Sequence, residues 1–304
     1  MSAPERPPSL DPVAAARWAA YPVGMSSPWL HEEVASRMQD RLDFIKLQPT
    51  IWAHWEPARG GLLAHTALQK RYPRAQVWLS SADAGQALAA RSAVKGRWWQ
   101  AARWLEPRIQ VGLPPEGQVQ MLWANMLLHT AAQPQKLLKT WHSALAVDGF
   151  LMFSCLGPDT LRELRNAYAL QGWPEPAHEF TDMHDWGDML VEAGFAEPVM
   201  DMERITLTYE TPERMLAELR ELGRNLHVQR FAGLRGRRWR DQLLQLLLTL
   251  AKPEEGGRLT LSFEIVYGHA LKPRPRVKVR TQTEIGLDQM RQMLSTPTAK
   301  ADKV

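Results

Sequence analysis

The segment 54–61 (HWEPARGG) carries the residue types that most suggest a ligand-binding turn in this chain. It follows the apolar stretch 50–53, and a strand that turns through glycines into a helix can hold a nucleotide-like ligand. Glycines let the backbone approach the ligand, and the helix N-terminus offers free N–H groups. Gly60 and Gly61 are the glycines of this turn, and Arg59 stands directly before them. The segment therefore indicates an α/β protein with an altered ligand loop.

Polar side chains also follow two further predicted strands, at 75–79 and 119–123. In a parallel sheet, ligands bind beyond the carboxyl ends of the strands, so these side chains are expected near the glycine turn. His129 is about equally compatible with lining a site and with a buried structural role. The candidates after these strands are Ser81, Asp83, Asn125, Met126 and His129.

The elements that must position these residues alternate between strands and helices. The strand patterns are almost wholly apolar, which is typical of a parallel sheet covered by helices on both faces, and hence of an α/β fold. Beyond the two strands above, strands are expected near 51–55 and at 109–111, 150–155, 199–209 and 259–270. Helices are expected at 29–47, 62–72, from 84 toward a tryptophan-rich connector ending at 107, at 134–145, from 159, at 183–192 and at 211–222.

The domain organisation expected from these patterns has three parts. Residues 1–28 are expected to be a flexible leader, and 29–271 a single domain with a helical insertion and cap within about 159–258. Residues 272–304 are expected to be a basic, mobile tail. The 304-residue length is ample for a domain with a sizeable core.

Composition narrows the class of protein. No apolar run is long enough to span a bilayer, and the first twelve residues lack the apolar region of a secretory signal. The single cysteine, Cys155, excludes an internal disulfide and favours a reducing cytoplasm. Its apolar surroundings favour a buried structural thiol over a nucleophile. The acidic and histidine residues of 182–188 lack the spacing of a metal site, so no metal is expected.

Positive charge is concentrated in two segments, although the net charge is only +4. Segment 235–240 (RGRRWR) and segment 272–280 (KPRPRVKVR) would attract a polyanion such as nucleic acid or an acidic protein. A solvated surface and a mobile tail explain the same charges about equally well. No nucleic-acid-binding motif accompanies them, so nucleic acid is the less expected partner.

From Trp123 onward the chain resembles class I S-adenosylmethionine-dependent methyltransferases. Within that class it is most similar to the malonyl-acyl-carrier-protein O-methyltransferases of biotin synthesis. The likeness covers about residues 28–271, and several of its motifs arrive in the right order and spacing. The matching segments are 122–129 (LWANMLLH), 145–151 (LAVDGFL), 157–165 (GPDTLRELR), 182–190 (DMHDWGDML), 194–209, 222–225 (LGRN) and 261–268 (LSFEIVYG).

The resemblance implies a Rossmann-like class I methyltransferase fold: a mostly parallel seven-stranded sheet with helices on both faces and an antiparallel last strand. It also implies S-adenosylmethionine as cofactor. The family's acidic residue and three glycines fall on Trp55, Pro57, Arg59 and Gly61, so one of these four positions is retained. Its ribose-binding acid falls near Ser81. The cofactor-binding residues implied are Glu56, by a one-residue shift, with Gly60, Gly61, Ser81, Asp83, Asn125 and Met126.

The resemblance further implies transfer of a methyl group to a carboxylate, such as that of a malonyl thioester on acyl carrier protein. Such a reaction needs alignment of two reactants more than acid–base catalysis, and no catalytic residue is assigned. The substrate-binding candidates are His129, Arg162 and Arg224, with Arg165 and Arg204 also considered. The carrier protein is acidic, so the arginines of segment 235–240 would steer it to the site.

Two alternatives stay open beside methyl transfer. One is a non-catalytic relative that keeps the fold and the carrier-binding surface. The other is an assembly or scaffolding factor that uses the tryptophan-rich segment and the basic segments as contacts.

Overall fold

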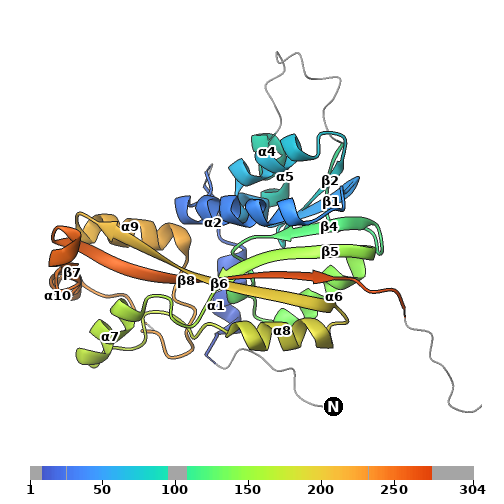
Figure 1. Cartoon of the computed structure of the whole chain (residues 1–304). Helices are drawn as coiled ribbons and strands as arrows, with labels where there is room; N and C mark the ends of the chain where they lie inside the picture. The colour runs from blue at the N-terminus through green and yellow to red at the C-terminus, as the bar shows by residue number, and fades with distance from the viewer. Residues whose placement is uncertain (1–8, 25, 95–107, 232, 276–304) are drawn as a thin grey trace, which may run out of the picture. The chain divides into compact units, whose positions relative to one another are not determined.

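The computed structural model (Figure 1) describes residues 9–24, 26–94, 108–231 and 233–275. Contacts divide the chain into a unit of residues 1–273 and a short unit of residues 274–304, and the fold below is that of the first. Most of the expected basic tail, and the tryptophan-rich connector at 95–107, lie outside the described residues.

A central sheet of eight strands, in the order β3-β2-β1-β4-β5-β8-β6 with β7 beside β8, organises the described residues. The first five strands in this order are parallel, and β8 runs antiparallel to both β5 and β6. The strand order reverses between β1 and β4, which is where such sheets bind ligands. The bounds are β1 Ile51–Trp55, β2 Gln76–Ser80, β3 Ile109–Val111, β4 Val119–Ala124, β5 Leu145–Leu156, β6 Ala196–Tyr209, β7 Ala251–Lys252 and β8 Arg258–Leu271.

This arrangement confirms the predicted α/β class and the antiparallel last strand. The count is one strand higher than expected because Ala251–Lys252 pairs with the start of β8 as a two-residue strand. The helices are α1 Pro12–Ala19, α2 Trp29–Asp40, α3 Pro57–Gly60, α4 Leu62–Arg71, α5 Ala84–Val94, α6 Pro134–Ala144, α7 Arg162–Leu170, α8 Met183–Glu192, α9 Pro212–Leu222 and α10 Arg237–Leu248, with 3-10 turns at Arg41–Phe44, Leu128–Thr130 and Pro253–Glu255.

The two faces of the sheet carry separate apolar cores, because successive strand side chains point to opposite faces. Trp52 of β1 packs with α2, α4 and α5, whereas its neighbour Ala53 packs with α6 and α8. β5 repeats the division, with Phe150 in the first core and Leu151 in the second. Both faces are therefore covered by helices, as the apolar strand patterns predict (Figure 1).

Helices α7, α9 and α10 gather around the extended ends of β6 and β8 (Figure 1). Helix α7 begins at Arg162 rather than near Asp159, because Leu161 adopts a left-handed conformation with φ +58° before it. The segment expected to be a leader includes α1 in its described part, where Trp18 is 9% exposed. No described helix has the length and apolarity to cross a membrane. Cys155 is buried, and burial raises the pKa of its thiol.

Candidate functional site

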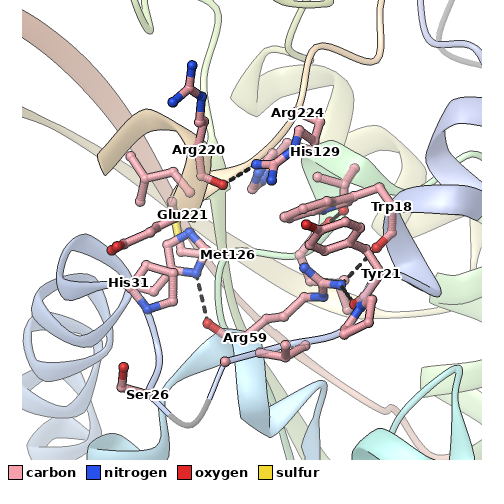
Figure 2. A pocket seen from close by; sticks show the side chains of 17 residues that line it. Trp18, Tyr21, Ser26, His31, Arg59, Met126, His129, Arg220, Glu221 and Arg224 are labelled. Carbon is pink, nitrogen blue, oxygen red and sulfur yellow. Dashed lines mark hydrogen bonds between the residues drawn. The ribbon is translucent and has the colours of Figure 1, made fainter. Parts of the chain in front are cut away.

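A cavity of about 320 Å³ lies at the carboxyl ends of β1 and β4, where the strand order reverses (Figure 2). Four segments line it: the connection from α1 to α2, the turn after β1, the segment after β4 and the end of α9. We call it the switch cavity. Its position is the one that sequence reasoning predicts for a ligand site.

The turn after β1 is helical rather than an open glycine loop. Glu56 has φ +52°, and Pro57–Gly60 then form the single helical turn α3. The buried Glu56 carboxylate accepts hydrogen bonds from Ser81 Oγ at 2.7 Å and from the Ala82 amide at 2.6 Å. Burial raises the pKa of Glu56 above its ordinary value, and these two bonds oppose the shift. The structure brings the candidates Glu56 and Ser81 together, but they bind each other.

The two glycines of the turn face protein atoms rather than open space. A Cβ at Gly60 would lie 3.1 Å from the Asn125 carbonyl oxygen, and one at Gly61 would lie 2.9 Å from Glu32 Oε2. Gly61 also has φ +132°, a backbone conformation that side chains rarely adopt. Glycine at these positions therefore serves the packing of the turn against α2 and the end of β4.

Of the remaining cofactor candidates, two are hydrogen-bonded within the protein and one lines the switch cavity. Asn125 Nδ2 donates to the carbonyls of His31, at 2.8 Å, and Gly60, while its Oδ1 accepts from Ser154 Oγ at 2.6 Å. Asp83 is exposed and caps α5 by accepting from the Gln86 amide at 2.8 Å. Met126, with φ +53°, lines the switch cavity. Of the seven predicted cofactor residues, Met126 alone is among the side chains lining this cavity.

Arg59, where the resemblance implies a glycine, lines the cavity. Its Nη2 donates to the carbonyls of Trp18 at 2.8 Å and Tyr21 at 2.6 Å, and its guanidinium carbon lies 4.1 Å from the centroid of the Trp18 ring. The Arg59 carbonyl in turn is 2.8 Å from Nδ1 of the buried His31. Desolvation lowers the pKa of Arg59, the charge of Glu56 opposes this shift, and the charge of Arg224 adds to it. The turn after β1 thus holds the α1–α2 connection against the cavity.

Two more arginines reach the cavity from the end of α9. The Arg224 guanidinium carbon lies 5.4 Å from the Trp18 ring centroid and 5.1 Å from that of Tyr21 (Figure 2). Arg220 lies one helical turn earlier and also lines the cavity. Among the described residues, no ion pair joins a carboxylate to Arg59, Arg220 or Arg224. The cavity is therefore electropositive.

A second cavity of about 340 Å³ adjoins the first and is mainly apolar. Helices α7, α9 and α10 contribute Leu164, Leu216 and Leu243 to its wall. We call it the helical-cap cavity. The two cavities share wall residues: His129, Thr130, Arg220, Leu222 and Arg224.

His129 stands at the boundary of the two cavities and is buried. Its Nδ1 accepts from the Leu156 amide at 3.3 Å, and its carbonyl is 2.6 Å from His178 Nε2. Desolvation holds the pKa of His129 well below its ordinary value, so the ring is neutral at pH 7. The residue is both a structural and a cavity-lining histidine.

The other predicted substrate residues lie elsewhere. Arg162 sits on the surface, 3.6 Å from Asp159, outside the residues that line either cavity. Arg204 binds the same carboxylate at 2.6 Å. Arg165 donates to the His178 carbonyl at 2.6 Å and braces the loop after α7. Arg224 is the predicted substrate cation that the structure places at the cavities.

Helix α10 joins a charged surface to the helical-cap cavity. Trp239 and Leu243 line that cavity, while Arg237, Arg238 and Arg240 are exposed. Arg235 stacks on Trp239, with its guanidinium carbon 3.9 Å from the ring centroid. No cluster of three or more metal-ligating side chains occurs in the described part of the chain.

Sequence reasoning missed the contribution of the α1–α2 connection. Trp18 and Tyr21 stack at 5.9 Å between ring centroids and line the switch cavity. Two large aromatic residues three positions apart, in a segment interpreted as a leader, are the signal that could have indicated a packed role.

Comparison with known proteins gives a consistent set of relatives. Malonyl-[acyl-carrier protein] O-methyltransferases are similar at 40% identity over 261 residues in Gallionella capsiferriformans (83% of this chain, 87% of the relative) and at 37% over 262 residues in Laribacter hongkongensis (82% and 86%). The enzyme of the same name from Nitrosospira multiformis is 34% identical over 287 residues, which is 88% of this chain and 92% of that relative. No protein-family model matches the chain.

Solved structures agree on the fold. A candidate methyltransferase from Bacillus halodurans aligns with a TM-score of 0.52 at 15% identity, covering 79% of this chain and all of that one. The YcgJ protein of Bacillus subtilis aligns with a TM-score of 0.51 at 12% identity, covering 79% of this chain and 99% of that one. These likenesses support the methyltransferase fold.

Proposed function

Since the chain belongs to the malonyl-[acyl-carrier protein] O-methyltransferase family, we propose that it is an S-adenosylmethionine-dependent methyltransferase of biotin synthesis. Its substrate is the free carboxylate of a malonyl thioester carried by acyl carrier protein. Family membership supplies the reaction class, and the geometry of the two cavities supports the substrate.

The adjoining cavities are the observation that carries the substrate assignment. A carrier-bound malonyl group has a long, largely uncharged arm that ends in a carboxylate. The helical-cap cavity offers apolar walls for the arm, and the switch cavity offers cations for the carboxylate. Arg224 lines both cavities, so it can meet the carboxylate where the arm emerges from the apolar part.

The chain's chemical contribution to this reaction is positioning. The carboxylate oxygen is itself the nucleophile, so no general base is required. The walls of the cavities therefore need only to desolvate this oxygen and to orient it toward the methyl group. The neutral His129 ring can line the path without adding a charge.

The residues of the glycine turn do not fit S-adenosylmethionine in the way the resemblance implies. Glu56 and Asn125 already use their polar side-chain atoms within the protein, and Gly60 and Gly61 face protein atoms. The arginines of the switch cavity also repel a sulfonium. Losing two charge-assisted contacts lowers affinity by roughly two to four powers of ten, at about 1.5–3 kcal/mol each. We therefore infer that the donor binds weakly.

That misfit favours a second candidate function: a family member that binds the malonyl carrier without methylating it. The apolar cavity and the exposed arginines of α10 would serve this function equally. The two candidates share the carrier and differ only in turnover.

The carrier would approach over α10. This helix lines the helical-cap cavity through Trp239 and Leu243 and carries exposed arginines beside it. Acyl carrier proteins are acidic, and complementary charge speeds and orients such encounters. Docking there would place the thioester arm at the apolar cavity.

The test is a methylation assay with malonyl-acyl carrier protein and S-adenosylmethionine, read by mass spectrometry of the carrier. Acetyl-acyl carrier protein, which lacks the free carboxylate, is the control substrate. We expect Arg224→Gln to reduce the rate at least tenfold, whereas Arg214→Gln leaves it unchanged. Arg214 is on the same helix but is exposed and paired with Glu218 at 2.7 Å.

Formation of a methyl ester on the malonyl carrier, but not on the acetyl carrier, supports the first function. Carrier binding without product over a wide range of donor concentration supports the second. A chain that neither binds nor methylates the malonyl carrier contradicts both.

A further inference from the structure

We propose that the switch cavity holds an oxyanion between Arg59 and Arg224. The observation behind this proposal is two cationic side chains in one cavity with no carboxylate paired to either among the described residues. A carboxylate and a phosphate are the two sources of such an anion. For the malonyl carboxylate, the inference rests on the proposed function; for a phosphate group, it stands without it.

Arg59 is held in place from one side. Its Nη2 donates to the carbonyls of Trp18 and Tyr21, and its guanidinium stacks on the Trp18 ring. Its Nη1 and Nε have no hydrogen-bond partner among the described residues, while the side chain lines the cavity. A guanidinium anchored through one nitrogen presents its other donors in a fixed direction, which suits an oxyanion.

Arg224 faces the same aromatic pair from the end of α9. Figure 2 shows Arg59 and Arg224 both reaching toward the rings of Trp18 and Tyr21. The Arg224 Nη1 donates to the carbonyls of Arg220 and Gly223. Its Nε and Nη2 make no hydrogen bond to a described residue, so donors remain available on this side as well.

The nearby acids form no ion pair with either arginine among the described residues. Glu56 is close enough to offset part of the Arg59 charge, but its carboxylate is bonded to Ser81 and Ala82 rather than to the guanidinium. Glu221 lines the cavity and forms no ion pair with either arginine. The neighbouring His31 and His129 are buried and neutral, so they add no further positive charge. Arg59 is half-buried and Arg224 is exposed, and an anion that binds both relieves the repulsion between the two guanidiniums.

Arg59 stands at a position where the resemblance implies a glycine. A small residue there would leave room and no charge. The arginine instead hydrogen-bonds the α1–α2 connection and adds a positive charge that favours anionic ligands in the cavity. A carboxylate seated between the arginines would also offset the charge that opposes a sulfonium.

Calorimetric titration of the full chain with malonate and, separately, with inorganic phosphate tests the proposal at constant ionic strength. We expect one or both anions to bind. We expect Arg59→Gln and Arg224→Gln each to weaken that binding roughly ten- to hundredfold, the effect of losing one charge-assisted contact. Arg162→Gln is the control, because Arg162 lies outside both cavities.

The titrations with malonate and with phosphate distinguish the two sources of the anion. Malonate binding that depends on both arginines assigns a carboxylate, and phosphate binding that depends on them assigns a phosphate. Absence of binding by both anions, or binding that Arg224→Gln leaves unchanged, overturns the proposal. Arg59→Gln can also loosen the α1–α2 connection, so a thermal melt accompanies it and Arg224→Gln decides the outcome if it unfolds. Anion binding without methyl ester formation supports this site and refutes methyl transfer.

Discussion

Replacing Arg59 with alanine should release the α1–α2 connection from the switch cavity. The substitution removes two hydrogen bonds, at 2.8 Å to the Trp18 carbonyl and 2.6 Å to the Tyr21 carbonyl, and the stacking on the Trp18 ring. Because Arg59 is partly exposed, each bond is worth about 1 kcal/mol rather than the full value for a charged donor. The stacking adds about 0.5–1 kcal/mol. The local opening free energy should fall by about 2–3 kcal/mol.

Hydrogen exchange with mass spectrometry measures this change directly. The Ala20 amide donates to the Ala16 carbonyl and the Tyr21 amide to the Trp18 carbonyl, so peptides within residues 12–24 report on the connection. Their exchange should accelerate by roughly 30- to 150-fold, which is the fold-change equivalent to that free energy.

Arg71→Ala is the matched control, because Arg71 pairs with Asp43 at 2.7 Å, away from the connection. It should leave the same peptides unchanged. Equal protection in wild type and Arg59→Ala would contradict this prediction, because other contacts would then hold the connection. Gln86 Nε2 donates to the Ala19 carbonyl at 3.0 Å, and the Arg224 guanidinium lies near the Trp18 and Tyr21 rings.

Three further predictions follow from the contacts described. Glu56→Ala should lower the free energy of unfolding by about 1.5–3 kcal/mol in urea titrations, and Glu56→Gln by less, because the carboxylate joins the turn after β1 to the turn after β2. Burial lowers the pKa values of His31 and His65 to about 4, so the unfolded state binds more protons than the folded state between pH 6.5 and 4. The free energy of unfolding should therefore decrease as the pH is lowered from 6.5 to 4, by up to about 1.4 kcal/mol per pH unit for each histidine, in urea titrations at several pH values. Charge reversal at Arg237 and Arg238 should slow carrier association in a salt-dependent manner, measured by stopped flow; salt-independent rates would contradict the docking surface.

Local signals in the sequence were sufficient for many elements. The strand at 109–111 and the helix at 183–192 have the expected bounds, the latter because Asp182 accepts from the His184 amide as an N-cap. Helix α1 has an equivalent signal in Asp11 followed by a proline, but its short length and proline-rich surroundings favour a leader on sequence grounds. Its packing depends on Leu226, far along the chain.

Long-range partners explain the elements that sequence reasoning misplaced. A helix was expected from residue 159, yet the Asp159 amide donates to Glu264 at 2.5 Å and its carboxylate binds Arg204. Both partners are more than forty residues away in the chain. No local pattern contains that information.

The candidate site shows the same limit. Strand ends correctly indicated where the cavity lies, and Met126, His129 and Arg224 line it. Glu56 and Ser81, however, are 25 residues apart and satisfy each other, which residue types alone do not reveal. The sequence also does not reveal the contacts of Arg59, whose side chain is partly buried against Trp18.

The most direct test of the proposed function is methyl ester formation on malonyl-acyl carrier protein at increasing S-adenosylmethionine concentration. We predict product from the malonyl carrier and none from the acetyl carrier. Absence of product at every donor concentration would contradict the proposed function.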